Sequence, residues 1–187
     1  LTIDLWISRP QPEPRLVFVH RAPGAVARSL ERSNGWPPER GLALWERTNR
    51  NAIVRLDRRE VFVIDHETVV ADPDGVVGSL GQWLGHGDEE AKARAVATIE
   101  RADGTEVATA DTGAEPSESQ RALAERLGRS SGPTRLDLAG LGPETPSTDP
   151  TLGRAGNVEL ARRVARAARA MPRRHRLEIA GTASPAR

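Results

Sequence analysis

The chain of 187 residues has no cysteine and no tyrosine, and its aromatic residues are limited to four Trp and two Phe. Without cysteine there is no disulfide, no thiolate metal ligand and no cysteine nucleophile. No apolar run approaches the ~20 residues that a membrane-spanning helix needs, and no apolar segment typical of a signal peptide is visible. These absences lead us to expect a cytoplasmic protein without a membrane span.

An excess of charge of one sign is also missing. The chain carries 27 Lys and Arg against 26 Asp and Glu, which gives a net charge of +1 at pH 7. Lys92 is the only lysine, so arginine supplies nearly all of the positive charge. This balance argues against a protein that binds polyanions over its whole surface, and we expect no nucleic-acid partner.

The first half of the sequence alternates strand and helix signals. Continuously apolar runs at 16–20 and 61–64 predict two buried strands. Helices are predicted at 25–32, 37–56 and 72–84, where proline or an Asp-Pro pair opens the second and third of them. Uniformly apolar strands separated by helices are typical of a parallel α/β sheet.

The signals weaken after Gly85. Helices are predicted at 88–101 and, from the capping-box spacing of Ser117 and Gln120, at 117–128. Residues 131–157 are rich in Gly, Pro, Ser and Thr and are interpreted as a linker. Residues 158–187 form an Arg/Ala-rich tail, for which we favour a solvated helix or a disordered segment over a nucleic-acid or membrane anchor.

Two strands are too few for a domain that stands alone. The sequence also begins within an apolar segment, Leu1–Ile7. Together these features lead us to expect a domain truncated at its N-terminus, with further strands before Leu1. Residues 1–130 would then be the C-terminal part of that domain.

The candidate site lies where the first predicted strand ends. Ligands of open parallel sheets bind beyond the carboxyl ends of the strands, and Arg21 stands at that position. An arginine there can hold an anion with two hydrogen bonds, beside the free N–H groups of the helix that follows. Ser29, about one turn into the predicted helix, could donate to the same anion. The alternative, which we weight about equally, is that Arg21 pairs with a nearby carboxylate and Ser29 has no role.

The spacing of Arg21 and Ser29 resembles that in bacterial sulfotransferases. In that family a strand ends in an Arg, a Pro-containing turn follows, and a helix carries a Ser eight residues after the Arg. Further along, Asp72-Pro73 and Trp83-Leu84-Gly85 resemble an Asp-Pro pair and a Phe-Leu-Gly helix end of the family. His66 takes the place of a Tyr that contacts adenine in some members, so this adenine contact is in doubt. The resemblance is strongest over residues 16–85.

The resemblance implies an α/β fold with a P-loop-like, three-layer parallel sheet and flanking helices. It implies transfer of a sulfuryl group from 3′-phosphoadenosine 5′-phosphosulfate to a hydroxyl or amine of a small molecule, sugar or lipid, without a metal. Arg21 and Ser29 would bind the 3′-phosphate of this donor. The chain has no GxxxxG[KR]-type loop for the phosphosulfate and no recognisable catalytic base. The alternative is therefore a non-catalytic remnant that serves as a binding or interaction module.

Other residues with reactive side chains are better explained by structural roles. His20 is next to Arg21 but is more typical of a packed strand-end histidine than of a general base. His66 and Glu67 could suggest acid–base chemistry, but the resemblance implies that Glu67 is structural and stabilises the turn after the second strand. The four histidines show no metal-binding spacing. Trp36 is a weak candidate for contact with an acceptor.

Overall fold

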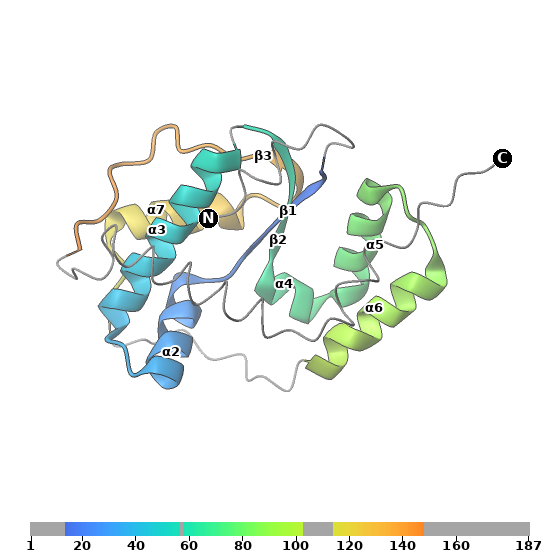
Figure 1. The fold of residues 1–187 in the computed structure, drawn as a ribbon, viewed down its shortest axis with the longest axis horizontal. Helices are drawn as coiled ribbons and strands as arrows, with labels where there is room; N and C mark the ends of the chain where they lie inside the picture. Colours follow the sequence, from blue (N-terminus) through green and yellow to red (C-terminus); the bar gives the residue numbers. More distant parts are fainter. Residues whose placement is uncertain (1–13, 57, 103–113, 148–187) are drawn as a thin grey trace. The chain divides into compact units, whose positions relative to one another are not determined.

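The computed structural model describes residues 14–56, 58–102 and 114–147, which contain six helices and three strands (Figure 1). In chain order these elements are β1 (Leu16–His20), α2 (Pro23–Asn34), α3 (Pro38–Leu56), β2 (Glu60–Asp65), α4 (His66–Ala71), α5 (Pro73–Leu84), α6 (Glu89–Ala102), α7 (Glu118–Gly128) and β3 (Gly132–Arg135). The chain is thus mixed α/β. The Arg/Ala-rich tail and its expected helix lie outside the described residues.

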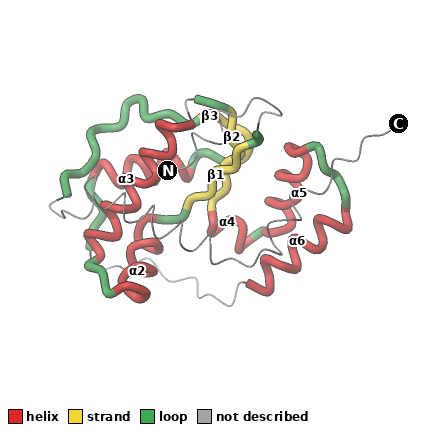
Figure 2. Tube along the Cα trace, viewed as in Figure 1, coloured by secondary structure: helices red, strands yellow, loops and turns green. Residues whose placement is uncertain are grey.

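The three strands form one small mixed sheet in the order β1-β2-β3 (Figure 2). β1 and β2 are parallel, with Leu16 opposite Val61 and His20 opposite Asp65. This pair confirms the parallel arrangement expected from the two apolar runs, because α2 and α3 provide the long crossover that parallel neighbours need. β3 pairs antiparallel to β2, so the expectation of an entirely parallel sheet is wrong.

The predicted linker at 131–157 is also wrong in its first part. Residues 132–135 form β3, and Leu136 beyond it is buried with 3% of its surface exposed. Leu138 and Leu141 pack against the same core. Single leucines spaced among Gly, Pro and Asp were enough to hold this segment to the protein, although its composition is typical of a linker.

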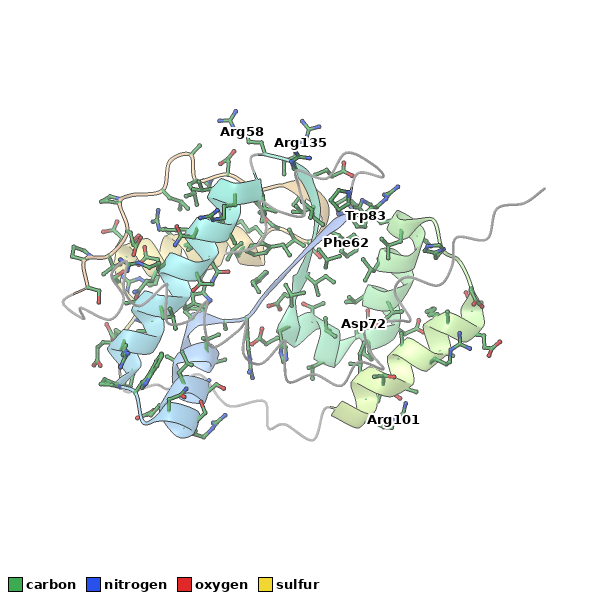
Figure 3. All side chains as sticks on the ribbon, in the orientation of Figure 1. Arg58, Phe62, Asp72, Trp83, Arg101 and Arg135 are labelled. Atoms are coloured by element: carbon green, nitrogen blue, oxygen red, sulfur yellow. The ribbon has the colours of Figure 1, made fainter. Side chains whose placement is uncertain are left out.

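The core lies on one face of the sheet. It joins alternate strand residues to the apolar faces of α3 and α7, namely Phe18, Val61, Val63, Trp45, Ile53, Leu56, Leu123, Leu127 and Leu136. The opposite face of β2 presents Phe62 and Ile64, and the Phe62 ring lies 5.5 Å from the Trp83 ring of α5 (Figure 3). Phe62 and Ile64 are buried on this face, whereas no residue of α5 itself is.

Local sequence signals explain most helix ends. The Asp72 carboxylate caps α5 by accepting a hydrogen bond from the Gly75 N–H at 3.0 Å, and Ser117 and Gln120 form the predicted capping box of α7. The short α4 was not predicted. It begins after Asp65, whose carboxylate accepts hydrogen bonds from the N–H and the hydroxyl of Thr68.

The backbones of α2 and α3 approach closely at Gly41. A Cβ atom on Gly41 would lie 2.7 Å from Ala27 Cα, which is closer than real atoms come. Ala27 itself is completely buried. Small residues on both helices therefore let α2 lie directly on α3, and this contact fixes the helix that carries Ser29.

A buried charged network joins α3 to α7 and to the segment after β3. Glu46 of α3 is fully buried, and its carboxylate accepts hydrogen bonds from Arg50 Nε at 3.0 Å and Ser119 Oγ at 2.6 Å. The Thr145 N–H donates to the same carboxylate. Arg50 also donates to Ser119 Oγ and to the Gly142 carbonyl. Burial alone would raise the pKa of Glu46, but these donors outweigh it and hold the pKa below its ordinary value.

Candidate functional site

The parallel pairing of β1 and β2 brings their carboxyl ends together. His20 ends β1 opposite Asp65, which ends β2. Arg21 follows directly on β1, and Glu67 lies in the first turn of α4. Four titratable side chains from segments more than 40 residues apart therefore meet at one edge of the sheet, the edge at which the sequence predicted a site.

Arg21 is fixed through its main chain and only loosely held through its side chain. Its carbonyl accepts a hydrogen bond of 2.9 Å from the indole of Trp45 on α3. Its Nε lies 3.7 Å from Glu67 Oε1, which is an ion pair but too long for a hydrogen bond. The same Nε is buried and has no hydrogen-bond partner in the described residues. The Nε thus has unused donor capacity but is shielded from solvent.

The structure places a carboxylate, that of Glu67, beside Arg21, as the alternative interpretation of Arg21 expected. Asp65 caps α4 at the turn after β2, and Glu67, interpreted as stabilising this turn, bonds with the Asp65 side chain and also forms an ion pair with Arg21. No sequence signal revealed this pair, because it depends on the register that sets β1 beside β2. An anion bound at Arg21 would have to share the guanidinium with Glu67.

Ser29 lies farther into its helix than the sequence indicated. Because α2 begins at Pro23 rather than near Ala25, Ser29 stands six residues in, at ~9 Å along the helix axis. It is half-buried, and no hydrogen bond joins it to Arg21 in the described part of the chain. One phosphate group cannot reach both the first-turn amides of α2 and Ser29, so a phosphate held by Ser29 lies along the side of the helix.

The N-terminus of α2 carries no competing group. Its N-cap residue, Ala22, has no side chain that could accept from the helix amides, and its first turn contains no acidic residue. No side chain of α2 therefore neutralises the positive end of the helix dipole. With Arg21 beside it, this end of α2 favours a negatively charged ligand.

His20 is a packed residue, in line with its interpretation as a core histidine. It is 7% exposed, its Nδ1 lies 3.6 Å from Asp65 Oδ1, and its Nε2 is buried without a hydrogen-bond partner in the described residues. Burial lowers the pKa of His20, although the charges of Asp65 and Glu67 and the Leu127 carbonyl act in the other direction. The buried imidazole is therefore neutral at pH 7.

The pKa of Asp65 is lowered although burial alone would raise it. Hydrogen bonds with the Glu67 side chain and with the side chain and N–H of Thr68 outweigh burial. Asp65 is therefore ionised at neutral pH. It stands between the neutral imidazole of His20 and the start of α4, and it contributes negative charge to this edge of the sheet.

The lowered pKa of His20 makes the folded state sensitive to mild acid. The unfolded chain takes up a proton on His20 near pH 6.5, whereas the folded chain resists it until a lower pH. The unfolded state therefore binds more protons in this interval, and we expect the free energy of unfolding to fall as pH drops below about 6.5.

Urea unfolding at a series of pH values tests this expectation. The His20→Asn variant should lose the pH dependence between neutral pH and about pH 5, whatever its absolute stability, because only the slope reports proton uptake. His86→Gln, in the exposed loop after α5, is the matched control and should keep the slope. Equal slopes for the wild type and His20→Asn would contradict the assignment.

The remaining candidates contribute nothing to this edge of the sheet. Trp36 is half-buried and stacks under the guanidinium of Arg40 at 3.9 Å, and nothing in the structure tests its contact with an acceptor.

In the described residues no group of three or more His, Asp or Glu is placed to hold a metal ion. Within the same residues, no helix has the length and apolar character to cross a membrane.

Comparisons with known proteins assign the chain to no family. A scan of protein-family models finds no match to the chain, and searches of curated proteins and of solved structures find no similar protein.

Proposed function

We propose that the chain binds 3′-phosphoadenosine 5′-phosphosulfate as part of a sulfuryl-transfer site, with Arg21 and Ser29 at the 3′-phosphate. The observation that carries this proposal is the guanidinium of Arg21, which lies at the carboxyl end of a parallel strand pair with a buried Nε that makes no hydrogen bond in the described residues. The spacing from Arg21 to Ser29 resembles that of the sulfotransferases, and this resemblance is what favours a phosphate over another anion.

The role of these residues is binding and orientation. Arg21 would donate charge-assisted hydrogen bonds to phosphate oxygens, and Ser29 would add a neutral one from the side of α2. The donor supplies the sulfuryl group, and a hydroxyl or amine of a small molecule, sugar or lipid accepts it. We assign no general base, and the loop that would hold the phosphosulfate is not in this sequence. The chain thus provides the 3′-phosphate half of the donor site.

Replacing Arg21 tests the proposal directly. Calorimetric titration of the full-length protein with adenosine 3′,5′-bisphosphate should show binding that Arg21→Ala weakens by about 1.5–3 kcal/mol, the contribution of hydrogen bonds to a charged group. Arg32→Ala is the matched control, because Arg32 is exposed in the last turn of the same helix. It should leave the affinity nearly unchanged. Equal affinities for the two variants would remove Arg21 from the site.

Glu67 provides a second, independent readout of the same site. Its carboxylate competes with a bound phosphate for the Arg21 guanidinium. Glu67→Gln should therefore bind the bisphosphate more tightly than the wild type.

The Arg21–Glu67 ion pair also favours a second candidate function. If Glu67 is the permanent partner of Arg21, the pair is structural and the chain is a non-catalytic binding or interaction module. The same titrations separate the two functions. A wild-type protein that is folded and does not bind the bisphosphate, even after Glu67→Gln, favours the module.

A further inference from the structure

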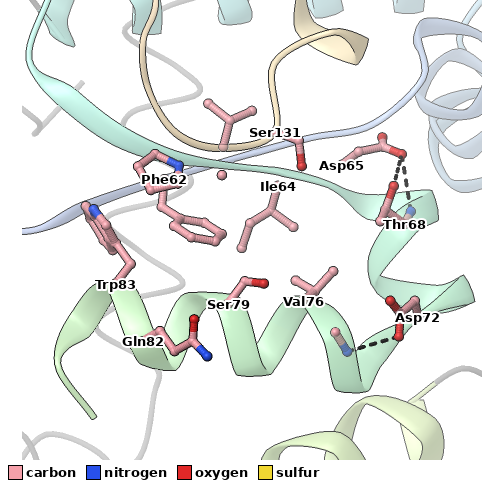
Figure 4. Close-up of a pocket in the computed structure, with 14 residues that line it drawn as sticks. Phe62, Ile64, Asp65, Thr68, Asp72, Val76, Ser79, Gln82, Trp83 and Ser131 are labelled. Atoms are coloured by element: carbon pink, nitrogen blue, oxygen red, sulfur yellow. Dashed lines mark hydrogen bonds between the residues drawn. The ribbon is translucent and has the colours of Figure 1, made fainter. Parts of the chain in front are cut away.

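A cavity of about 640 Å³ lies between the second face of the sheet and α5. Its volume falls within the ~300–1,000 Å³ of small-molecule sites. β2 forms one wall with Phe62 and Ile64, and α5 forms the other with Val76 and Trp83. The close-up shows the side chains of Val76 and Ser79 projecting from α5 toward Phe62 and Ile64 (Figure 4). The middle of the cavity is therefore apolar, with aromatic rings in its wall.

Polar side chains with spare hydrogen-bonding capacity border this apolar region. The side chains of Ser79, Gln82 and Ser131 line the cavity and make no hydrogen bond to other described residues. Ser131 belongs to the segment that leads into β3. A few polar groups around an apolar body are the arrangement by which proteins orient small ligands.

The charge in the lining has one sign. Asp65 and Asp72 are the charged members of the described lining, and they lie at the end of the cavity opposite Trp83 and Gln82 (Figure 4). Each carboxylate caps a helix through one oxygen, Asp65 Oδ2 for α4 and Asp72 Oδ1 for α5. Asp72 Oδ2 keeps acceptor capacity, whereas Asp65 Oδ1 lies 3.6 Å from His20 Nδ1 and shares its capacity with that ring.

The described lining of the cavity contains no cation. Lys92 lies outside it and pairs with Asp74 at 2.8 Å, and its charge also interacts with Asp72 from there. Arg15 lies over the Trp83 ring and donates to the Trp83 carbonyl, also outside the lining. His20, which faces Asp65 from β1, is buried and neutral at pH 7. An anionic ligand would meet two carboxylates and no cation among the described lining residues, whereas a cation would find acceptors there.

From the apolar walls and the two carboxylates at one end, we infer that this cavity binds a small organic ammonium ion with an aromatic or aliphatic body. The body lies between Phe62, Ile64 and Val76, and the ammonium group donates to Asp72 and Asp65. This site uses neither Arg21 nor Ser29 and does not rest on the proposed function. Its opposite charge preference also separates it from the anion site at the end of β1.

Three probes with the same ring test the inference. Titrations with benzylamine, benzyl alcohol and benzoate, followed by the indole N–H signal of Trp83 in nitrogen–proton correlation spectra, report binding at the cavity. Benzylamine should bind about threefold to fivefold more tightly than benzyl alcohol, the effect of a partly exposed ion pair, and benzoate should bind most weakly. The preference for benzylamine should shrink at high salt.

Two variants locate the binding. Asp72→Asn removes the charge but keeps a good helix cap, so it should abolish most of the preference for benzylamine while the protein stays folded. Asp88→Asn is the control, since Asp88 precedes α6 outside the cavity, and it should behave as the wild type. Ser79→Phe places a ring in the cavity from an exposed helix position and should abolish binding of all three probes.

The inference is overturned if benzylamine does not shift the Trp83 signal, or if benzyl alcohol or benzoate binds as well as benzylamine. It is also overturned if Asp72→Asn and Asp88→Asn have the same preference, or if Ser79→Phe, shown by circular dichroism to be folded, still binds. The bisphosphate titrations at Arg21 are unaffected by any of these results.

Discussion

Arg50→Met is expected to lower the free energy of unfolding by about 3–5 kcal/mol, the cost of leaving a buried charge without its partner. The charge is that of Glu46, whose side chain is fully buried in α3. Arg50 donates to this carboxylate and also holds Ser119 of α7 and the Gly142 carbonyl after β3. Methionine keeps the length and helix propensity of the side chain but removes every one of these donors. Urea unfolding followed by circular dichroism measures the loss.

The chain contains a matched control for this prediction. Glu90 and Arg94 form the same four-residue pair on α6, but both side chains are more than half exposed. Arg94→Met should change the stability by no more than about 0.5 kcal/mol. The double variant Glu46→Gln/Arg50→Met should recover part of the loss, because glutamine removes the unpaired charge. If Arg50→Met costs no more than Arg94→Met, the buried network does not stabilise the fold.

Leu123→Ala is expected to destabilise the protein by about 2–5 kcal/mol. Leu123 lies on α7 with none of its surface exposed, in the cluster that also contains Phe18, Trp45 and Leu127. Alanine removes three carbon atoms and leaves a space that the surrounding helix and sheet cannot fully close. The measurement is again the free energy of unfolding in urea.

Leu84→Ala is the comparison for this core substitution. Leu84 ends α5 and is 36% exposed, so the same change removes far less buried contact and should cost well under half as much. Equal losses at the two positions would mean that α7 does not pack on the sheet as described.

The sequence predicts those elements whose signal is local and repeated. The apolar runs of β1 and β2, the Asp-Pro start of α5 and the capping box of α7 each carry their information within a few neighbouring residues, and the structure contains all four. β3 has no such signal. Its residues Gly132, Pro133, Thr134 and Arg135 form a strand only because β2, about 70 residues earlier, offers an edge to pair with.

The candidate site also has residues that the sequence predicts and contacts that it does not. The position of Arg21 after a strand could be predicted, because a short apolar run ending in Arg before a Pro-Gly pair is visible in the sequence. Its ion pair with Glu67 could not, since it depends on strand register. Glu46 and Arg50 have the spacing of an ordinary surface pair on a helix, and only the packing of Ser119 and Thr145 over them makes the pair a buried one.

The direct contact of Gly41 with Ala27 has a consequence for ligand affinity. With α2 resting on α3, and the Arg21 carbonyl held by the Trp45 indole, the end of β1 is already ordered before any ligand arrives. Binding there loses little conformational entropy, so a few hydrogen bonds suffice for measurable affinity.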